Sequence, residues 1–311
     1  MKRRKFLING VKYSLGAVLL SPILKEGESK AATTRFKPQP AEWREDEINV
    51  AWIGHSTVLI NFYGKVILTD PVMFNRVGVY LLGFTIGPSR ITRPALTFDE
   101  MPKPDLILLS HAHMDHMDYP SLDSFSSKYP DQIDCLTAYN TQDVIRHFDW
   151  KSLQELDWRE ETEIQGIKIK AIEVKHFGWR FPWERDRSKG FMKNGRSFNA
   201  YILEYKGTKI LFGGDTAMTD HFKQSGESVD IAIMPIGAYQ PWKRNHCNPE
   251  EALQMAKDLN AKVFIPIHTK TFRQGMEPDN EPLTWLRESV KAYDIQLGIS
   301  DIGETYTSAS M

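Results

Sequence analysis

One short segment of the chain concentrates side chains that bind metals. Residues 110–118 read SHAHMDHMD and contain three of the chain's nine histidines. Neutral imidazole and carboxylate groups are ligands that Zn²⁺ and similar divalent ions take in proteins. Alternate residues of an extended turn can point the same way, so His111 and His113 can face one ion while Asp115 and His116 face a second. The alternative is a solvated loop that is merely rich in histidine.

The segment follows a run, residues 105–109 (DLILL), that predicts a buried strand. Open α/β sheets place their functional sites beyond strand ends, where this segment would lie. Further runs rich in β-branched and apolar residues also predict strands: residues 50–52, 57–62, 65–68, 167–174, 198–205, 209–212, 230–234 and 263–267. The later strands alternate with helix signals, the clearest being an N-cap, a first-turn proline and a capping-box glutamate at Asn248, Pro249 and Glu251. This order predicts a mixed α/β sandwich.

The sequence resembles the metallo-β-lactamase superfamily. HAHMDH at residues 111–116 matches the metal motif of that superfamily. Other strings between about residues 50 and 286 are similar to the branch of N-acylphosphatidylethanolamine-hydrolysing phospholipase D and its bacterial relatives: WIGHST (52–57), LTDP (68–71), GPSR (87–90), GGDT (213–216), PIGAYQP (235–241) and NPEEA (248–252). The resemblance implies a four-layer αββα sandwich with metals at the joined edge of its two sheets, formed by a single catalytic domain over residues 48–311.

The resemblance also implies two zinc ions held by seven side chains. One ion would be held by His111, His113 and His176, the other by Asp115, His116 and His268, and Asp215 would bridge them. The three ligands outside the opening segment each follow a strand-like run. Two glycines before Asp215 let the backbone approach the site.

Other candidate residues have different expected roles. Asp70 also ends a strand-like run and is a candidate to orient a ligating imidazole. His55, within the GHST string, is expected to be structural or to support a ligand rather than bind metal. His147 and His221 lack such a setting and are expected to be surface or core residues.

Two metal ions can lower the pKa of a bound water and stabilise the oxygens of a displacement. No Gly-x-Ser-x-Gly elbow is present to supply a serine nucleophile. Asp115 would orient the nucleophile, and the resemblance implies that His246 faces the substrate, where it could donate a hydrogen bond or a proton to the leaving alcohol. Packing ahead of the following helix is the alternative for His246.

The leading interpretation is a dinuclear zinc phosphodiesterase of the phospholipase D type, with a phospholipid or another small phosphodiester as substrate. A hydrolase of lactones, β-lactams or other cyclic esters is an alternative, as is a periplasmic zinc-binding protein without turnover. Many relatives have HWGTF after the last ligand where this chain has HTKTF (268–272), which places a cation near the metals. The apolar run 76–86 is either core or a lipid contact, and the segment WRFPW (179–183) has the character of an interfacial contact.

The first 31 residues differ from the rest of the chain. Basic residues at positions 2–5 precede an apolar run to about residue 24, and small residues at 31–32 suit a signal peptidase. The RRKFL core resembles the twin-arginine export signal. These features predict a signal peptide over residues 1–31 and a linker over residues 32–47. They also predict that the protein is periplasmic or otherwise exported, and they are compatible with its association with a membrane. A basic amphipathic helix or an uncleaved anchor is the alternative.

Composition is typical of a soluble globular protein and argues against one class of partner. The chain has 311 residues, of which 41% are hydrophobic and 25% charged, as in soluble globular proteins. Residues 1–31 carry seven Lys/Arg and two Glu, so the remainder is more acidic than the whole chain, whose formal net charge is −1. Enzymes of nucleic acids show the opposite bias, so no nucleic-acid partner is expected. The two cysteines, Cys135 and Cys247, allow at most one disulfide.

Overall fold

Two seven-stranded sheets form the centre of the computed structural model, which describes residues 31–185, 187 and 195–309. The first sheet has the order β16-β1-β2-β3-β6-β7-β8. Its strands are β1 (Glu47–Gly54), β2 (Thr57–Phe62), β3 (Lys65–Thr69), β6 (Leu106–Leu108), β7 (Asp134–Ala138), β8 (Ser152–Leu156) and β16 (Thr305–Ala309). The second has the order β15-β14-β13-β12-β11-β10-β9. Its strands are β9 (Glu161–Ile164), β10 (Ile167–Glu173), β11 (Asn199–Tyr205), β12 (Thr208–Phe212), β13 (Ile231–Pro235), β14 (Val263–Ile267) and β15 (Gln296–Leu297).

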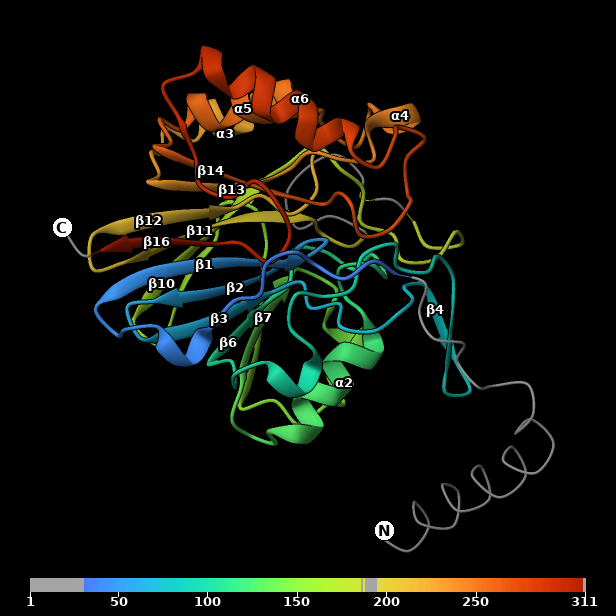
Figure 1. The fold of residues 1–311 in the computed structure, drawn as a ribbon. Helices are drawn as coiled ribbons and strands as arrows, with labels where there is room; N and C mark the ends of the chain where they lie inside the picture. The colour runs from blue at the N-terminus through green and yellow to red at the C-terminus, as the bar shows by residue number, and fades with distance from the viewer. Residues whose placement is uncertain (1–30, 186, 188–194, 310–311) are drawn as a thin grey trace, which may run out of the picture. The chain divides into compact units, whose positions relative to one another are not determined.

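Helices cover the outer faces of the two sheets (Figure 1). Leu122 and Phe125 of α2 (Tyr119–Lys128) are packed in one apolar cluster with Ile107 of the first sheet. The helices α3 (His221–Gln224), α5 (Pro249–Asp258) and α6 (Glu281–Ser289) lie over the second sheet, and α4 is Tyr239–Trp242. Short 3₁₀ turns are η1 (Pro40–Glu42), η2 (Phe98–Glu100), η3 (Gln142–Val144) and η4 (Val290–Ala292). The predicted α/β sandwich with two central sheets is confirmed.

The core between the sheets follows from the sequence pattern. Runs such as IAIMP in β13 and VFIPI in β14 are buried at every position, as expected for strands covered on both faces. One large cluster joins residues from both sheets, including Trp52, Ile60, Leu203 and Ile233. All nine predicted strands are present: β2 and β14 have the predicted bounds, and the ends of the others differ by up to three residues.

Each sheet has an antiparallel part and a parallel part. Strands β3, β6, β7 and β8 run parallel in the first sheet, and β12, β13, β14 and β15 run parallel in the second. Parallel strands bring their carboxyl ends to the same edge of a sheet. The loops after β6, β12 and β14 lie at such edges and contain six of the seven predicted ligands, while His176 follows the antiparallel strand β10.

Strands β4 (Val79–Leu81) and β5 (Phe84–Ile86) form a separate hairpin outside both sheets. Its residues are exposed, with Leu82 at 84%. The run 76–86 is therefore not core, although Val77 at its base is buried against Val72 and Phe272.

The predicted signal peptide, residues 1–31, falls almost wholly outside the described residues. In the segment predicted as a linker, the backbone of Ala32 accepts a hydrogen bond from Arg93 and donates one to Ile91, both 2.8 Å long. The domain boundaries stay predictions. Among the helices of the described residues, none has the length and apolar character needed to cross a membrane. Cys135 and Cys247 are both buried free thiols, so no disulfide joins them.

Candidate metal centre

The seven predicted ligands lie together where the loops after four strands meet. Four of the seven follow β6, namely His111, His113, Asp115 and His116. The other three are His176 after β10, Asp215 after β12 and His268 after β14. Gly214 makes this approach possible, because a Cβ atom there would lie 2.7 Å from Cβ of Ser110, and its φ of +56° favours glycine. The sequence therefore brings side chains from both sheets to one place through close backbone packing.

Three imidazoles converge in the first predicted ligand set. Nδ1 of His113 lies 2.8 Å from Nε2 of His111 and 3.2 Å from Nε2 of His176. His111 is buried and the other two are largely buried. Burial lowers the pKa of all three rings, that of His113 to about 4, which keeps them neutral as metal ligands must be.

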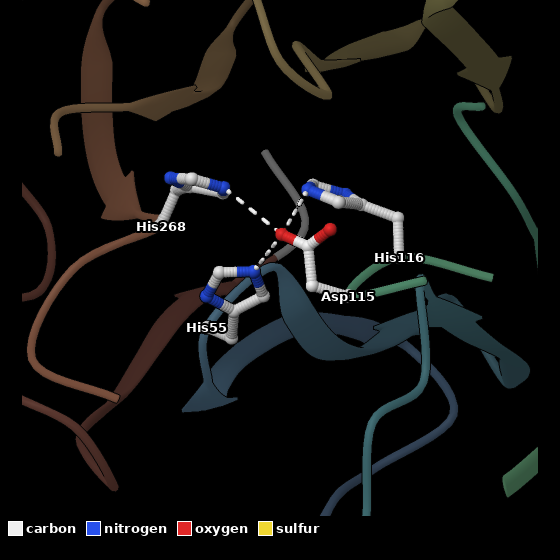
Figure 2. Close-up of side chains that lie close together, drawn as sticks. All are labelled: His55, Asp115, His116 and His268. Carbon is white, nitrogen blue, oxygen red and sulfur yellow. Dashed lines mark hydrogen bonds and ion pairs between the residues drawn. The ribbon is translucent and has the colours of Figure 1, made fainter. Parts of the chain in front are cut away.

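The second predicted set gathers around one oxygen of Asp115. Figure 2 shows Oδ2 of Asp115 facing three imidazoles, with Nε2 of His116 at 3.4 Å, Nε2 of His268 at 3.5 Å and Nε2 of His55 at 2.9 Å. His55 thus donates to the carboxylate from the side opposite the other two rings. Burial lowers the pKa of His55 to about 3, so its ring is neutral and its Nε2–H is a fixed donor to Asp115.

Asp215 lies between the two sets, as a bridging ligand must. Its Oδ2 is 3.1 Å from Nε2 of both His116 and His268, and 3.8 Å from Nε2 of His176. Burial disfavours a charge on His268, but Asp215 and Asp115 outweigh it and raise the pKa of His268 to about 9. The same two carboxylates raise the pKa of His116 against its burial. The site therefore attracts positive charge, which protons or a divalent cation can supply.

Neighbouring groups fix the rings so that one nitrogen of each points inward. Nδ1 of His116 donates to Asp70, 2.6 Å away, and Nδ1 of His176 donates to the carbonyl of Asn245, 2.9 Å away. Nδ1 of His111 lies 2.9 Å from Oγ of Ser110, which itself donates to Asp70. Such partners select the tautomer that leaves Nε2 free for a metal.

Unpaired buried atoms test whether these residues fit a metal. Nε2 of His116, Nε2 of His268 and Oδ1 of Asp215 are buried and make no hydrogen bond of acceptable geometry within the described residues. Unpaired buried polar atoms are rare. Here they lie among groups of side chains able to hold an ion, including His111, His113 and His176 in one group and His55, Asp115, His116 and His268 in another. The donor set of imidazole nitrogens and carboxylate oxygens suits zinc and related divalent ions.

A cleft of about 440 Å³ opens directly onto this cluster. Its walls combine the ligands with aromatic side chains: His113, Asp115, Phe177, Trp179, Asp215, Ala238, Trp242, Asn245, His246 and Gln274. His246 therefore faces the cleft. Its Nδ1 lies 3.7 Å from Oδ2 of Asp215 and has no hydrogen-bond partner in the part of the chain that the structure describes. Burial lowers the pKa of His246 to about 4. Its position beside Asp215 and His176 also permits metal binding by this residue.

Some residues lie elsewhere than expected, and one was missed. Lys270 forms an ion pair with Asp301 at 2.7 Å and does not line the cleft, so it places no free cation at the metals. As expected, His147 and His221 lie outside the cluster, where they contact Tyr119 and Glu173.

The sequence did not predict a role for Gln274. Its amide donates to Oδ2 of Asp115 at 2.5 Å, and no motif marks this residue because it lies 159 positions away in the chain.

Comparisons with known proteins agree with this geometry. A family profile described as a beta-lactamase superfamily domain matches residues 65–269. N-acyl-phosphatidylethanolamine-hydrolyzing phospholipase D 1 of Caenorhabditis elegans is 29% identical over 286 residues, covering 85% of this chain and 77% of that protein. The mitochondrial N-acyl-phosphatidylethanolamine-hydrolyzing phospholipase D of Saccharomyces cerevisiae is 32% identical over 246 residues, covering 74% of this chain and 49% of that protein.

Solved structures share the fold at lower identity. A metallo hydrolase from the archaeon Ignicoccus hospitalis matches with a TM-score of 0.61 at 18% identity, covering 84% of this chain and 98% of that one. The profile spans most of the sandwich and includes every predicted ligand. The chain therefore belongs to the beta-lactamase superfamily, within which it is a metal-dependent hydrolase.

Proposed function

We propose that the chain is a dinuclear zinc phosphodiesterase of the phospholipase D type that acts on lipids like N-acylphosphatidylethanolamine. The observation that supports the proposal is that two groups of side chains able to bind metal, with Asp215 between them, lie at the base of an aromatic cleft. The names of the nematode and yeast relatives support the substrate class.

The protein side chains have distinct roles in this reaction. Bound divalent ions supply an activated water and Lewis-acid stabilisation of the phosphoryl oxygens. Asp115, held by His55 and Gln274, positions the nucleophile below the cleft. His246 faces the same space, where its neutral ring donates a hydrogen bond to a phosphoryl oxygen. The aromatic walls formed by Phe177, Trp179 and Trp242 exclude water and contact the apolar part of the substrate.

The first test compares substrates on purified, zinc-loaded protein. We expect hydrolysis of bis(p-nitrophenyl) phosphate and release of a phosphatidic acid from N-acylphosphatidylethanolamine in micelles, with little turnover of a lactone or nitrocefin. Asp115→Ala is the matched negative control, since it removes a ligand and the orienting carboxylate together. Turnover of the lactone with none of either diester would assign the protein to carbonyl hydrolysis instead.

The metal count is tested separately by elemental analysis. We expect about two equivalents of metal per chain, and less than full occupancy after Asp215→Ala, because this carboxylate contacts ligands of both groups. One equivalent in well-folded protein, or full occupancy in the variant, would contradict the bridging role of Asp215.

We propose in addition that the chain is exported after folding through the twin-arginine route. The support is the pair Arg3-Arg4 ahead of an apolar run in the sequence. Replacing both residues by lysine should retain the precursor in the cytoplasm, as measured by cell fractionation and immunoblotting. Unchanged export of the variant would point to the general secretory route.

A further inference from the structure

The β4–β5 hairpin exposes most of its apolar side chains. Between Arg76 and Arg90 the sequence contains no charged residue. The large apolar side chains of the hairpin are all more than a third exposed: Val79, Tyr80, Leu81, Leu82, Phe84 and Ile86. Contiguous exposed apolar patches of this kind mark interaction sites.

The turn of this hairpin carries a side chain that the backbone disfavours. Leu82 has a φ of +51° and is followed by Gly83 at +90°. Two-residue turns with this geometry favour Asn, Asp or Gly at the first position. The hairpin between β11 and β12 has the same geometry, with Lys206 at +48° and Gly207 at +80°, and places a charged side chain there. Because the side chain of Leu82 is exposed, its burial within the chain does not offset the cost of this backbone conformation. A leucine here therefore points to a contact outside the chain.

The hairpin is fixed at its base and connected to the metal-binding loop. A Cβ atom on Gly78 would lie 2.2 Å from the carbonyl oxygen of Ile86, so the two strands meet closely there. The ring of Tyr80 stacks on Tyr119, with centroids 5.3 Å apart. Tyr119 begins α2, three residues after His116. The hairpin is thus a defined projection beside the site rather than a remote feature.

Two other segments with exposed aromatic residues also adjoin the cleft. Residues 177–183 are held against the metal-binding loop by Arg180, which donates to the carbonyls of Ala112 and Met117, and they end in Trp183, which is 78% exposed. Residues 239–247 include Trp242, which lines the cleft and is 52% exposed. In Figure 1, α4, which contains Trp242, and β4 lie toward the same side of the view.

The charges around these segments favour an anionic surface as the partner. None of the residues in 76–90, 177–183 or 239–247 is Asp or Glu, although the chain as a whole carries a formal net charge of −1. Arg76, Lys243 and Arg244 are exposed in these segments, and the latter two form no ion pair with any described residue. Apolar side chains flanked by cations and by tryptophan complement the interface of a bilayer with anionic lipids.

We propose that the β4–β5 hairpin inserts into the surface of an anionic lipid bilayer and, with Trp183 and the Trp242-Lys243-Arg244 segment, places the cleft opening against the headgroups. The proposal rests on the proposed lipid substrate for its biological purpose, but the binding itself requires no turnover. Leu81, Leu82 and Phe84 enter the acyl boundary, while Lys243 and Arg244 contact anionic headgroups.

The test uses the full chain with a single reporter at the hairpin tip. Leu82→Cys is labelled with an environment-sensitive nitrobenzoxadiazole maleimide, which the buried Cys135 and Cys247 do not accept. Lys206→Cys, at the corresponding position of the β11–β12 turn, is the matched control. Both are mixed with vesicles of phosphatidylcholine with and without phosphatidylglycerol.

We expect a blue shift and a rise in emission at position 82, larger with phosphatidylglycerol and reduced by salt, and no change at position 206. No change at position 82, or equal changes at both positions, would overturn the proposal. A shift at position 82 that follows protein concentration without vesicles would assign the hairpin to contact with a second copy of the chain and would also overturn it.

A variant set separates docking from the reaction. Changing Leu81, Leu82 and Phe84 together to Ser should reduce vesicle binding by about tenfold or more, because the burial of apolar side chains drives partitioning. Changing the same residues to Met should restore it. Hydrolysis of soluble bis(p-nitrophenyl) phosphate should be the same in both variants as in the unaltered chain. Vesicle binding without lipid cleavage would refute the proposed substrate and leave the docking surface in place.

Discussion

At the scale of single residues, the centre depends on side chains that hold the ligands as much as on the ligands. Asp70 accepts from Nδ1 of His116 and from both the backbone and the hydroxyl of Ser110, whose Oγ in turn contacts His111. One carboxylate therefore orients a ring of each ligand group. Its φ of +33° is uncommon for a residue other than glycine.

Asp70→Asn should weaken metal binding while preserving the fold. Asparagine has nearly the same shape as aspartate and tolerates the positive φ. Its amide is neutral, however, so the Nδ1–H of His116 would lose its charged hydrogen-bond acceptor. We expect metal affinity to fall about 10- to 100-fold, as measured by competition with a chromophoric chelator. Thr69→Ser, one residue earlier on β3, is the control. Unchanged affinity in Asp70→Asn would mean that the second ring nitrogen of His116 needs no charged partner.

His246→Ala distinguishes a substrate-facing role from metal binding. If the ring acts on the substrate, kcat should fall about 10²- to 10⁴-fold while the metal content stays the same. If His246 is a ligand beside Asp215 and His176, the variant should lose metal in proportion to activity. Parallel elemental analysis and steady-state kinetics separate the two outcomes.

At the scale of elements, the sequence predicted the strands and the α5 cap because both signals are local. Asn248 accepts from the backbone of Glu251 at 2.9 Å, and Glu251 accepts from the backbone of Asn248 at 3.0 Å, as the capping box requires. The hairpin β4–β5 could not be assigned from the pattern, since its apolar residues do not alternate with polar ones.

The residues of the metal centre could likewise be predicted only where a local motif or the resemblance marks them. HAHMDH is a contiguous signal, and the resemblance supplied the other three ligands. Gln274, by contrast, reaches Asp115 only because the loop after β14 folds back over the cleft, where the carbonyl of Gln274 accepts from the indole of Trp242 at 3.2 Å. Lys270 was expected near the metals from its place in the motif, but its direction is set by Asp301, which no local pattern reveals.

Asn248→Ala should destabilise α5 without abolishing activity. The loss of the cap leaves the backbone N–H of Glu251 without its side-chain acceptor and should cost about 1 kcal/mol of unfolding free energy, measured by urea denaturation. Asn248→Asp, which keeps an acceptor, is the control and should cost less. A loss of activity much larger than the loss of stability would show that the cap also positions His246, two residues earlier.

At the scale of the whole molecule, the metal centre joins the two sheets. Its ligands come from loops of both, and the buried Nε2 atoms of His116 and His268 have no hydrogen-bond partner among the described residues, which leaves them available to a metal. Removing metal with a chelator should therefore lower the midpoint of thermal unfolding. At free metal about 1,000-fold above its dissociation constant, binding contributes about 4 kcal/mol. Adding zinc back should restore the midpoint, and Asp215→Ala should respond much less to the chelator.

The pairing of β1 with β16 determines when the chain can finish folding. These strands pair from Glu47 opposite Ala309 to Ala51 opposite Thr305, so the first sheet is completed by a strand that is synthesised after all of its other strands. Pairing across so long a separation requires closure of a very large loop, which slows folding. The edge of β1 therefore stays open until β16 has been synthesised and reaches it, so the first sheet is incomplete while its other strands are already present.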